Sequence, residues 1–290
     1  MTLTPFDPAP TEHALSRAMA GDGATHRAAC VRVGRFVTRH ACLELAAASS
    51  RGRGHRQNED AMSALDGGAP VYVVADGVGG GALASRASRG VVDCVHRRAD
   101  GVAIDRRVLR EALILADAEV RRSIAARTDA LGAATVALCA AVDEGLDRWL
   151  IGWVGDCRVY RVTPVGNALI ELVTRDDSYR HLAEAPPPGA TPDDPARMVG
   201  NGAVGTPNVA EAALDDDQML LLCSDGVHKR LEPGDIARVL AADAPLVRRC
   251  TRLVALARAR GSVDDATVLV ILKRSAAQAP VTTRPLRIDP

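Results

Sequence analysis

Aromatic side chains are scarce in this sequence, and neither sign of charge is in excess. Phenylalanine, tyrosine and tryptophan together make up 2% of the 290 residues. Lysine plus arginine and aspartate plus glutamate number 36 each, so the formal net charge is zero. Proteins that read single-stranded nucleic acid need aromatic stacking surfaces and basic charge. We therefore expect no nucleic-acid partner.

Long apolar runs are also missing. No stretch reaches the roughly 18 consecutive apolar residues of a membrane span, and the N-terminal residues lack the apolar centre of a signal peptide. The seven cysteines are scattered, without a C-x-x-C pair or a histidine at zinc spacing. We interpret them as small buried apolar side chains in a reducing compartment. The sequence predicts a cytoplasmic protein that binds no membrane.

The chain divides into three parts by pattern. Residues 1–40 show no sustained periodicity and are expected to form an N-terminal extension, partly disordered. Residues 41–274 carry the apolar patterns of one domain, and residues 275–290 form a tail. Strands come in runs and helices in pairs, which favours an α+β fold with stacked layers over a βαβ alternation.

Within the domain, two short apolar runs bracket a polar turn and predict one hairpin over residues 43–65. Residues 178–208 show no pattern over a length that is typical of a functional flap or of disorder. The remaining expected elements are strands at 71–74, 134–142, 148–162 (interrupted by a Gly-Asp turn), 168–174, 218–223 and 264–274, and helices at 83–99, 105–127 and within 233–260.

Carboxylates stand where the apolar strands begin or end. The residues in question are Glu59, Asp60, Asp76, Asp156, Asp225, Asp264 and Asp265. Ionised carboxylates that lie close together beside a core repel one another, so a cation must neutralise them. Because no histidine or cysteine alternates with these oxygens, the pattern favours Mg²⁺ or Mn²⁺ over zinc.

Glycine follows two of these acids directly, in the Asp-Gly pairs at 76–77 and 225–226. A residue without a side chain lets the backbone approach a metal, and the carbonyl of Gly77 is a possible ligand. Each pair taken alone is equally explained as an ordinary Asp-Gly turn. The recurrence of the same junction at several strand ends makes the turn-only explanation improbable.

Six motifs carry a resemblance to the metal-dependent type 2C (PPM) Ser/Thr protein phosphatases of the bacterial branch. In chain order they are NEDA (58–61), VVADGVGG (73–80), GAATVAL (132–138), WVGDCRVYR (153–161), LLLCSDGV (220–227) and GSVDDATVLVI (261–271). The resemblance covers residues 43–273 and implies a β-sandwich of two antiparallel sheets flanked by helix pairs. It also implies a binuclear Mn²⁺/Mg²⁺ centre in a cleft at one end of the sandwich.

The resemblance further implies roles for single residues. Asp76 would bridge both metals, Glu59 and the Gly77 carbonyl would bind one, and Asp225 and Asp264 would bind the other. Asp156 would help to hold a third, weaker ion. Asp60 would accept a hydrogen bond from metal-bound water. Such an enzyme hydrolyses phosphoserine and phosphothreonine by direct attack of a water that bridges the metals, and its partners are phosphorylated proteins and a cognate Ser/Thr kinase.

The sequence departs from the family pattern in the loop before Glu59. The family places a phosphate-binding arginine four residues before that glutamate, where this chain has His55, with Arg53 and Arg56 as neighbours. We choose Arg56 as the phosphate ligand, although a one-residue shift on an extended strand reverses the side-chain face. An ordinary surface arginine is the competing interpretation.

Three further departures leave the primary ligand set intact. Val78 stands where many eukaryotic members have a histidine proposed as general acid, and either His55 or His228 is a possible substitute. Asp177 stands where the family tends to have histidine, and Asp265 replaces a frequent asparagine.

Two other classes of protein compete with the phosphatase. One is a catalytically weak or inactive relative that keeps the fold and binds phosphoproteins as a regulator. Its expected mark is loss of metal ligands, whereas all the principal ones are present. The other takes GVGGGA as a nucleotide-binding loop, but Asp76 directly before it would repel a phosphate and no Lys-Ser/Thr follows.

Overall fold

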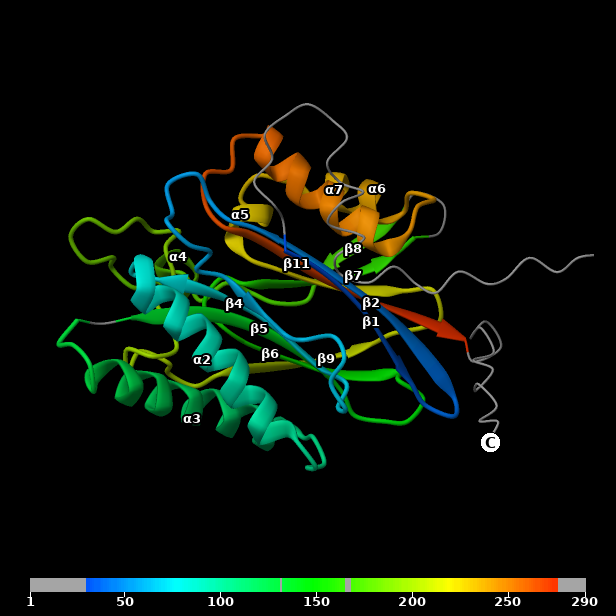
Figure 1. The fold of residues 1–290 in the computed structure, drawn as a ribbon, viewed down its shortest axis with the longest axis horizontal. Coiled ribbons are helices and arrows are strands. Elements are labelled where there is room, and N and C mark those ends of the chain that lie inside the picture. The colour runs from blue at the N-terminus through cyan, green and yellow to red at the C-terminus, as the bar shows by residue number, and fades with distance from the viewer. Residues whose placement is uncertain (1–29, 131, 165–167, 276–290) are drawn as a thin grey trace, which may run out of the picture.

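Two antiparallel sheets form the centre of the computed structural model, which describes residues 30–130, 132–164 and 168–275 (Figure 1). The six-stranded sheet has the order β1 (Cys30–Val37), β2 (Ala41–Ser50), β11 (Ala266–Ser275), β10 (Met219–Cys223), β7 (Arg158–Thr163) and β8 (Leu169–Leu172). The five-stranded sheet has the order β3 (Ala61–Met62), β4 (Val71–Val78), β5 (Ala133–Ala141), β6 (Arg148–Val154) and β9 (Asn208–Ala213).

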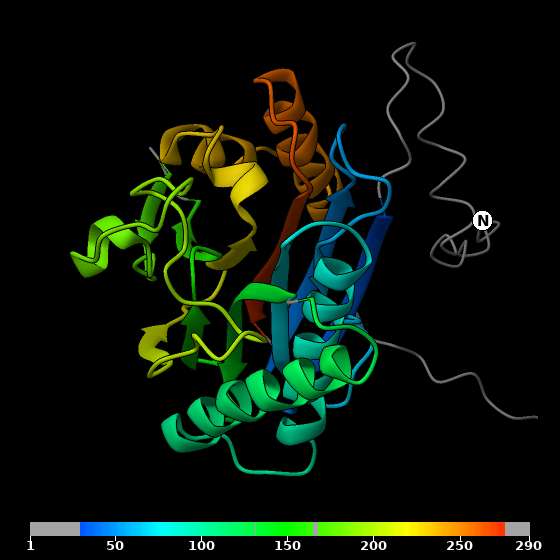
Figure 2. The ribbon, with the colours of Figure 1, turned by 90° about the vertical axis from the view of Figure 1, so that its left-hand side faces the viewer.

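A pair of helices covers the outer face of each sheet. The long helices α2 (Gly81–Ala99) and α3 (Arg106–Ala125) pack on the five-stranded sheet, and α6 (Pro233–Leu240) and α7 (Leu246–Ala259) pack on the six-stranded sheet (Figures 1 and 2). The one-turn helices α4 (Tyr179–Leu182) and α5 (Asp225–His228) lie in connecting segments. The expected α+β sandwich of two antiparallel sheets flanked by helix pairs is confirmed.

Three apolar layers hold these elements together. One lies between the sheets, and Tyr72 and Trp149 from the five-stranded sheet lie there with ring centroids 6.3 Å apart. The others lie between each sheet and its helix pair. The central strands are therefore buried on both faces, which explains why β4, β5 and β10 are continuous apolar runs without alternation.

The sequence predicts that residues 1–40 form a partly disordered extension, but residues 30–37 are part of the fold. They form the edge strand β1, which pairs along its whole length with β2, so the prediction of an extension is wrong for this segment. The pattern escaped notice because an edge strand has partly exposed faces. Residues 1–29 and 276–290 lie outside the described residues. Cys30, on the same strand, is exposed, whereas the other six cysteines are buried as expected.

The connections between strands also differ from the expectations in two places. The runs at 43–50 and 61–65 do not form a hairpin, since β2 and β3 belong to different sheets. Likewise the Gly-Asp turn after β6 leads across to β7 in the other sheet. Periodicity identifies strands but does not say which sheet receives them.

The patternless segment 178–208 is fixed to the rest of the fold, and its last residue starts a strand that the sequence did not predict. The amides of Gly200 and Gly202 donate to the buried carboxylate of Asp117 on α3, over 2.7 and 2.9 Å. Val199 forms a bridge with Ala134 of β5. The missed strand, β9, is rich in alanine, which has little strand preference.

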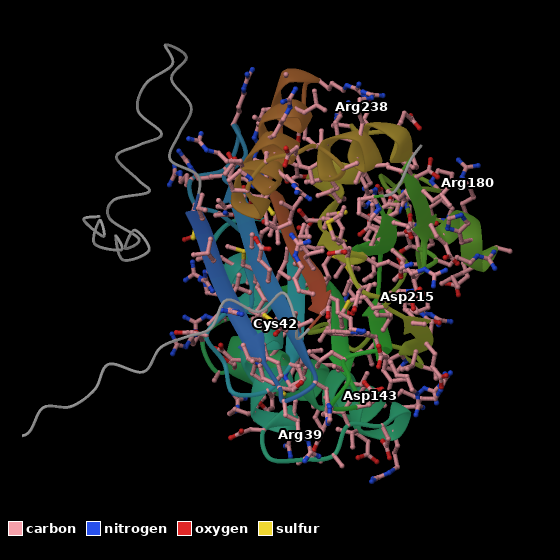
Figure 3. The ribbon with its side chains drawn as sticks, turned by 90° about the vertical axis from the view of Figure 1, so that its right-hand side faces the viewer. Arg39, Cys42, Asp143, Arg180, Asp215 and Arg238 are labelled. Carbon is pink, nitrogen blue, oxygen red and sulfur yellow. The ribbon has the colours of Figure 1, made fainter. Side chains whose placement is uncertain are left out.

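The antiparallel order brings the acidic junctions to one end of the sandwich. There β2, β4, β6 and β10 end and β7 and β11 begin. At the opposite end, the β1–β2 turn meets the β5–β6 turn, where Thr38 Oγ1 donates to the Glu144 carbonyl over 2.8 Å. Figure 3 shows Arg39 and Asp143 of these two turns at that end. Within the described ranges, no helix is long and apolar enough to span a bilayer.

Candidate metal centre

The Asp60 carboxylate ties the two sheets together at the acidic end. Asp60 directly precedes β3 of the five-stranded sheet. Its Oδ2 accepts hydrogen bonds from Ser224 Oγ, after β10, and from Thr267 Oγ1, in β11, over 2.8 and 2.6 Å. Both hydroxyls belong to the six-stranded side. The fold therefore fixes this carboxylate from residues more than 160 positions away.

Glu59 is held by its backbone and by its side chain. Its amide donates to Asp265 Oδ2 over 2.6 Å, and its carbonyl accepts from Ser88 Oγ over 2.5 Å. The Glu59 carboxylate accepts the Gly81 amide, at the first turn of α2, over 2.5 Å. A carboxylate at this place is stabilised by the positive end of the helix dipole.

Asp265 organises the loop before Glu59. Its carboxylate accepts the amides of Gly52 and Glu59, over 2.5 and 2.6 Å, and lies 3.0 Å from His55 Nδ1. The sequence places Asp265 among the acids at strand ends and as a replacement for a frequent asparagine, but it does not indicate this organising role. The role that the structure gives it depends on contacts across 206 residues, which no local pattern reports.

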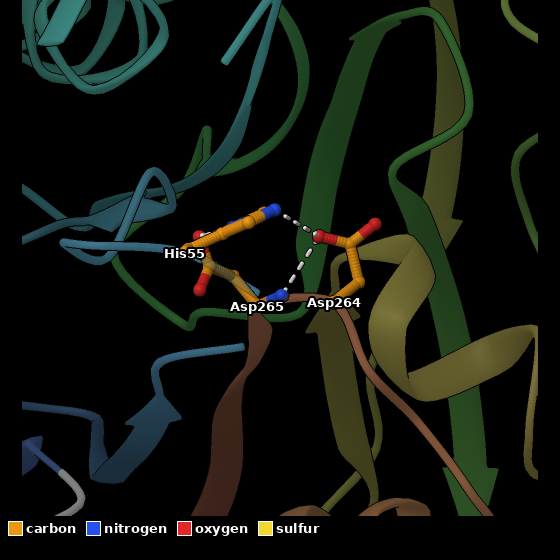
Figure 4. A group of neighbouring side chains, drawn as sticks. All are labelled: His55, Asp264 and Asp265. Carbon is orange, nitrogen blue, oxygen red and sulfur yellow. Dashed lines mark hydrogen bonds and ion pairs between the residues drawn. The ribbon is translucent and has the colours of Figure 1, made fainter. Parts of the chain in front are cut away.

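His55, rather than Arg53 or Arg56 of the same loop, lies next to Asp264 and Asp265 (Figure 4). Its Nε2 is 3.7 Å from Asp264 Oδ1, and ligand atoms of His55, Asp264 and Asp265 all lie within 4.8 Å of one another. Partial burial opposes protonation of His55, but the hydrogen bond and charge of Asp265 raise its pKa above the ordinary value. Arg53 and Arg56 are exposed, so the structure does not bring the predicted phosphate ligand Arg56 into this group.

Gly77 allows two chain segments to approach closely. A Cβ at this position would lie 2.5 Å from the Ala84 carbonyl oxygen and 2.7 Å from that of Glu59. Real Cβ atoms do not come so near to backbone, so only glycine fits between α2 and the Glu59 loop. This crowding is the structural reason for the glycine after Asp76.

The loop of Asp156 is fixed from two sides. Asp177 accepts the Gly155 amide over 3.1 Å and the Asn208 side-chain amide over 3.0 Å. On the other side, His228 Nε2 lies 2.8 Å from the Asp156 carbonyl oxygen, to which it donates. Burial, followed by the charge of Arg158, lowers the pKa of His228 to about 4, which keeps this histidine neutral. His228 is therefore a structural residue and not a substitute general acid.

The predicted acids act on one another electrostatically. Desolvation raises the pKa of Asp76 well above its ordinary value, and the charges of Asp60, Asp225, Asp156 and Asp264 raise it further. Burial is also the main reason why the pKa of Asp60 rises to about 7 and that of Asp156 to about 6. The carboxylates from distant strand ends therefore lie close enough to raise one another's pKa values by mutual repulsion.

The residues present fit a hard divalent cation. Three buried carboxylate oxygens have no hydrogen-bond partner in the described part of the chain: Asp60 Oδ1, Asp225 Oδ1 and Asp156 Oδ2, the last of which has only the ion-pair contact of Lys229 at 3.1 Å. Buried polar atoms without partners are rare and require an explanation, such as an ion. Carboxylate oxygens are the donors that Mg²⁺ and Mn²⁺ prefer. The orphaned oxygens and the mutual repulsion of the acids are both what a site for such a cation would show.

Metal-free protein is expected to lose stability as pH rises from 6.5 to 8. Asp60 and Asp76 have raised pKa values when folded, so their contribution is complete below the unfolded value near 4 and is lost as pH rises through the folded value. His228 has the opposite effect near pH 6.5, because an unfolded histidine with a pKa of 6.5 is about half protonated there whereas folded His228 is neutral, and this effect fades as pH rises to 8. A group that titrates in this window changes the stability by up to about 1.4 kcal/mol per pH unit.

Thermal melts in EDTA across this pH range test the prediction, with parallel melts in Mn²⁺. Mn²⁺ should raise the melting temperature more at pH 8 than at pH 6.5. Asp60→Asn should make the pH dependence in EDTA shallower. A melting temperature in EDTA that stays constant or rises with pH would show that these carboxylates are not under mutual repulsion.

Comparison with known families gives this arrangement its context. The family model described as protein phosphatase 2C matches residues 49–265, which is well over half of the chain. The chain belongs to the protein phosphatase 2C family. The matched range runs from the end of β2 to the start of β11 and so includes every acidic junction described above.

Solved structures of bacterial phosphatases of the 2C family share the fold. PppA, a key regulatory component of T6SS in Pseudomonas aeruginosa, is 28% identical, with a TM-score of 0.67 over 83% of this chain and 100% of PppA. The PPM Ser-Thr phosphatase MsPP from Mycobacterium smegmatis is 25% identical, with a TM-score of 0.65 over 79% and 97% of the two chains.

A third 2C phosphatase, the catalytic domain of PstP in complex with two manganese ions, is 22% identical, with a TM-score of 0.66 over 81% of this chain and all of that domain. At this sequence identity, the likeness to PstP shows that the two chains share a fold and nothing more. No curated protein sequence matches the chain.

Sequence reasoning overlooked residues that hold the acids of this 2C domain in place. The hydroxyls of Ser224 and Thr267 have no sequence signal, because their partner Asp60 lies far away in the chain. Lys229, in contrast, does have a sequence signal. It stands four residues after Asp225 at the start of a helix, and opposite charges at that spacing form a pair.

Proposed function

We propose that this 2C-family protein is a metal-dependent phosphatase that removes phosphate from phosphoserine and phosphothreonine in proteins. The observation that carries the proposal is the meeting of Asp60, Asp76, Asp225 and Asp264, whose mutual repulsion requires a cation. Family membership supports the same chemistry. The substrates are then phosphoproteins, and a Ser/Thr kinase is the partner that supplies them.

We propose that Asp76, Glu59, Asp225, Asp264 and the Gly77 carbonyl hold two Mn²⁺ or Mg²⁺ ions. The manganese-bound PstP domain supports this choice of ion. When bound, such ions neutralise the charge of a phosphomonoester and lower the pKa of an attacking water. The carboxylate donors and the close passage of Gly77 fit this role.

The protein's own groups supply the remaining steps. Asp60 is held through Oδ2 by two hydroxyls, which leaves Oδ1 to accept a proton or hydrogen bond from the attacking water. The exposed Arg56 has no ion-pair partner among the described residues, so its guanidinium remains available to grip phosphoryl oxygens. Arg56 as the phosphate ligand, like the cytoplasmic location, stays a prediction.

One observation favours a second candidate function, that of a catalytically weak regulator that binds phosphoproteins. His55 takes the place of the family's phosphate-binding arginine beside the acids, and Arg56 points to solvent. A weakened grip on phosphate would leave binding of the rest of the phosphoprotein as the main activity.

The phosphatase proposal predicts metal-dependent turnover. Purified protein with Mn²⁺ should hydrolyse p-nitrophenyl phosphate and a phosphothreonine peptide, whereas excess EDTA should reduce the rate to background and added Mn²⁺ should restore it. Arg56→Ala should raise KM for the peptide about 10-fold or more, as expected for loss of a charge-assisted contact, with Arg53→Ala as the matched control. Absence of turnover in Mn²⁺ together with binding of the phosphopeptide would support the regulator instead.

A further inference from the structure

Lysine is almost absent from this chain, which carries its positive charge on arginine. The two lysines are Lys229 and Lys273. Each places its ammonium between two aspartates, Lys273 between Asp147 and Asp216, and Lys229 between Asp156 and Asp225. Lysine supplies a compact point charge, where arginine supplies a planar fork. The acidic end thus has a small internal cation of its own.

The contacts of Lys229 are short and are made at the buried carboxylates. Its Nζ lies 3.1 Å from Asp156 Oδ2 and 2.7 Å from Asp225 Oδ2. The Asp156 side chain is only 4% exposed, whereas that of Lys229 is 40% exposed. An ammonium that reaches in from the rim therefore neutralises a charge that water does not reach.

The partner segments are held in register by other contacts. Lys229 follows Asp225 by four residues across the single turn of α5, so the two side chains share one side of that turn. His228 joins the same turn to the Asp156 carbonyl over 2.8 Å. The ammonium position is consequently set by backbone geometry and not by the flexible stem alone.

The two carboxylate oxygens of Asp225 have different surroundings. Its Oδ2 accepts from Lys229, and its Oδ1 is buried without a partner in the described ranges. One oxygen is satisfied by the internal ammonium, and the other remains for an external cation. A divalent ion at the position of the ammonium, against Asp156 Oδ2 and Asp225 Oδ2, would have to displace Lys229, and an ion close by would meet its positive charge.

We propose that Lys229 replaces the third divalent ion, so that the protein binds two ions and none between Asp156 and Asp225. The proposal rests on the binuclear centre of the proposed function. It revises the sequence-based expectation that Asp156 helps to hold a third, weaker ion. Asp156 is instead the counter-ion of Lys229, and its loop is fixed without metal.

Counting Mn²⁺ per chain tests the proposal without any measurement of activity. Protein stripped with EDTA is equilibrated with Mn²⁺, and bound metal is measured by elemental analysis and titration calorimetry. Wild type should bind two ions per chain, and Lys229→Ala should bind one more. The double variant Lys229→Ala/Asp156→Asn should return to two. Lys229→Met, which keeps the apolar stem, repeats the gain if the alanine variant is poorly folded.

Lys273→Met is the matched control, since it removes the other lysine that bridges two aspartates and should leave the metal count unchanged. A third ion in wild type, or two ions in both Lys229 variants, would overturn the role of Lys229 and leave the phosphatase proposal intact. Fewer than two ions in wild type would overturn the binuclear centre and this inference together.

Discussion

Replacing Asp76 by asparagine is expected to lower kcat/KM for p-nitrophenyl phosphate by about 10³-fold or more, because it removes the carboxylate proposed to join both ions. Asp76 lies in β4, at the register position opposite Thr135. It receives repulsion from four other aspartates, which makes it the electrostatic centre of the group. Steady-state kinetics in saturating Mn²⁺ measure the loss.

The same substitution should stabilise the metal-free protein, which separates a lost function from a lost fold. In EDTA at pH 8, Asp76→Asn removes one of the mutually repelling charges and should raise the free energy of unfolding by about 1 to 3 kcal/mol. Mn²⁺ should stabilise the variant less than it stabilises wild type. Asp66→Asn, at an exposed loop position, is the control and should change neither quantity. Wild-type turnover by Asp76→Asn would refute the binuclear assignment.

Much of the fold could be predicted because the central strands are buried on both faces. Runs such as β4 and β10 are continuously apolar and are followed closely by Asp-Gly, so their existence is visible in the sequence, although β4 continues past the expected residue 74 through Asp76 and Gly77 to Val78. The helix pairs were equally visible from their three- and four-residue spacing. What the sequence does not report is which strands are neighbours, and this is why β2 and β3 were joined in one hairpin.

The candidate site divides in a similar way. Its carboxylates could be recognised because acids at apolar strand ends are conspicuous, and the structure does bring them together. The contacts that orient them could not be recognised, since Asp60 is held by Ser224 and Thr267, and Glu59 by Asp265. The place of His55 was hidden by the same limit. The alternation of side chains along a strand does not reveal that His55 lies beside Asp264 while Arg53 and Arg56 are exposed to solvent.

Gly226→Ala is expected to destabilise the protein by about 3 kcal/mol or more and to abolish most of its activity. Gly226 lies at the start of α5, where a Cβ would overlap the carbonyl oxygen of Asp265. The atoms that this Cβ would meet belong to the backbone of Asp265 and Ala266, so no side-chain rotation relieves the overlap. Either α5 moves, and Asp225 and Lys229 with it, or the start of β11 moves together with the Asp265 carboxylate that organises the Glu59 loop.

Gly234→Ala provides the matched control, because Gly234 lies in the first turn of α6 and a Cβ there meets no atom within 4 Å. Alanine is favoured over glycine in a helix by up to about 1 kcal/mol, so this variant should be as stable as wild type or more stable. Urea denaturation gives the free energy of unfolding for each variant, and Mn²⁺ titration shows whether the remaining folded Gly226→Ala still binds metal. If Gly226→Ala unfolds at the wild-type urea concentration with wild-type turnover, then α5 does not need its close approach to β11, and the position of Asp225 is not set by that contact.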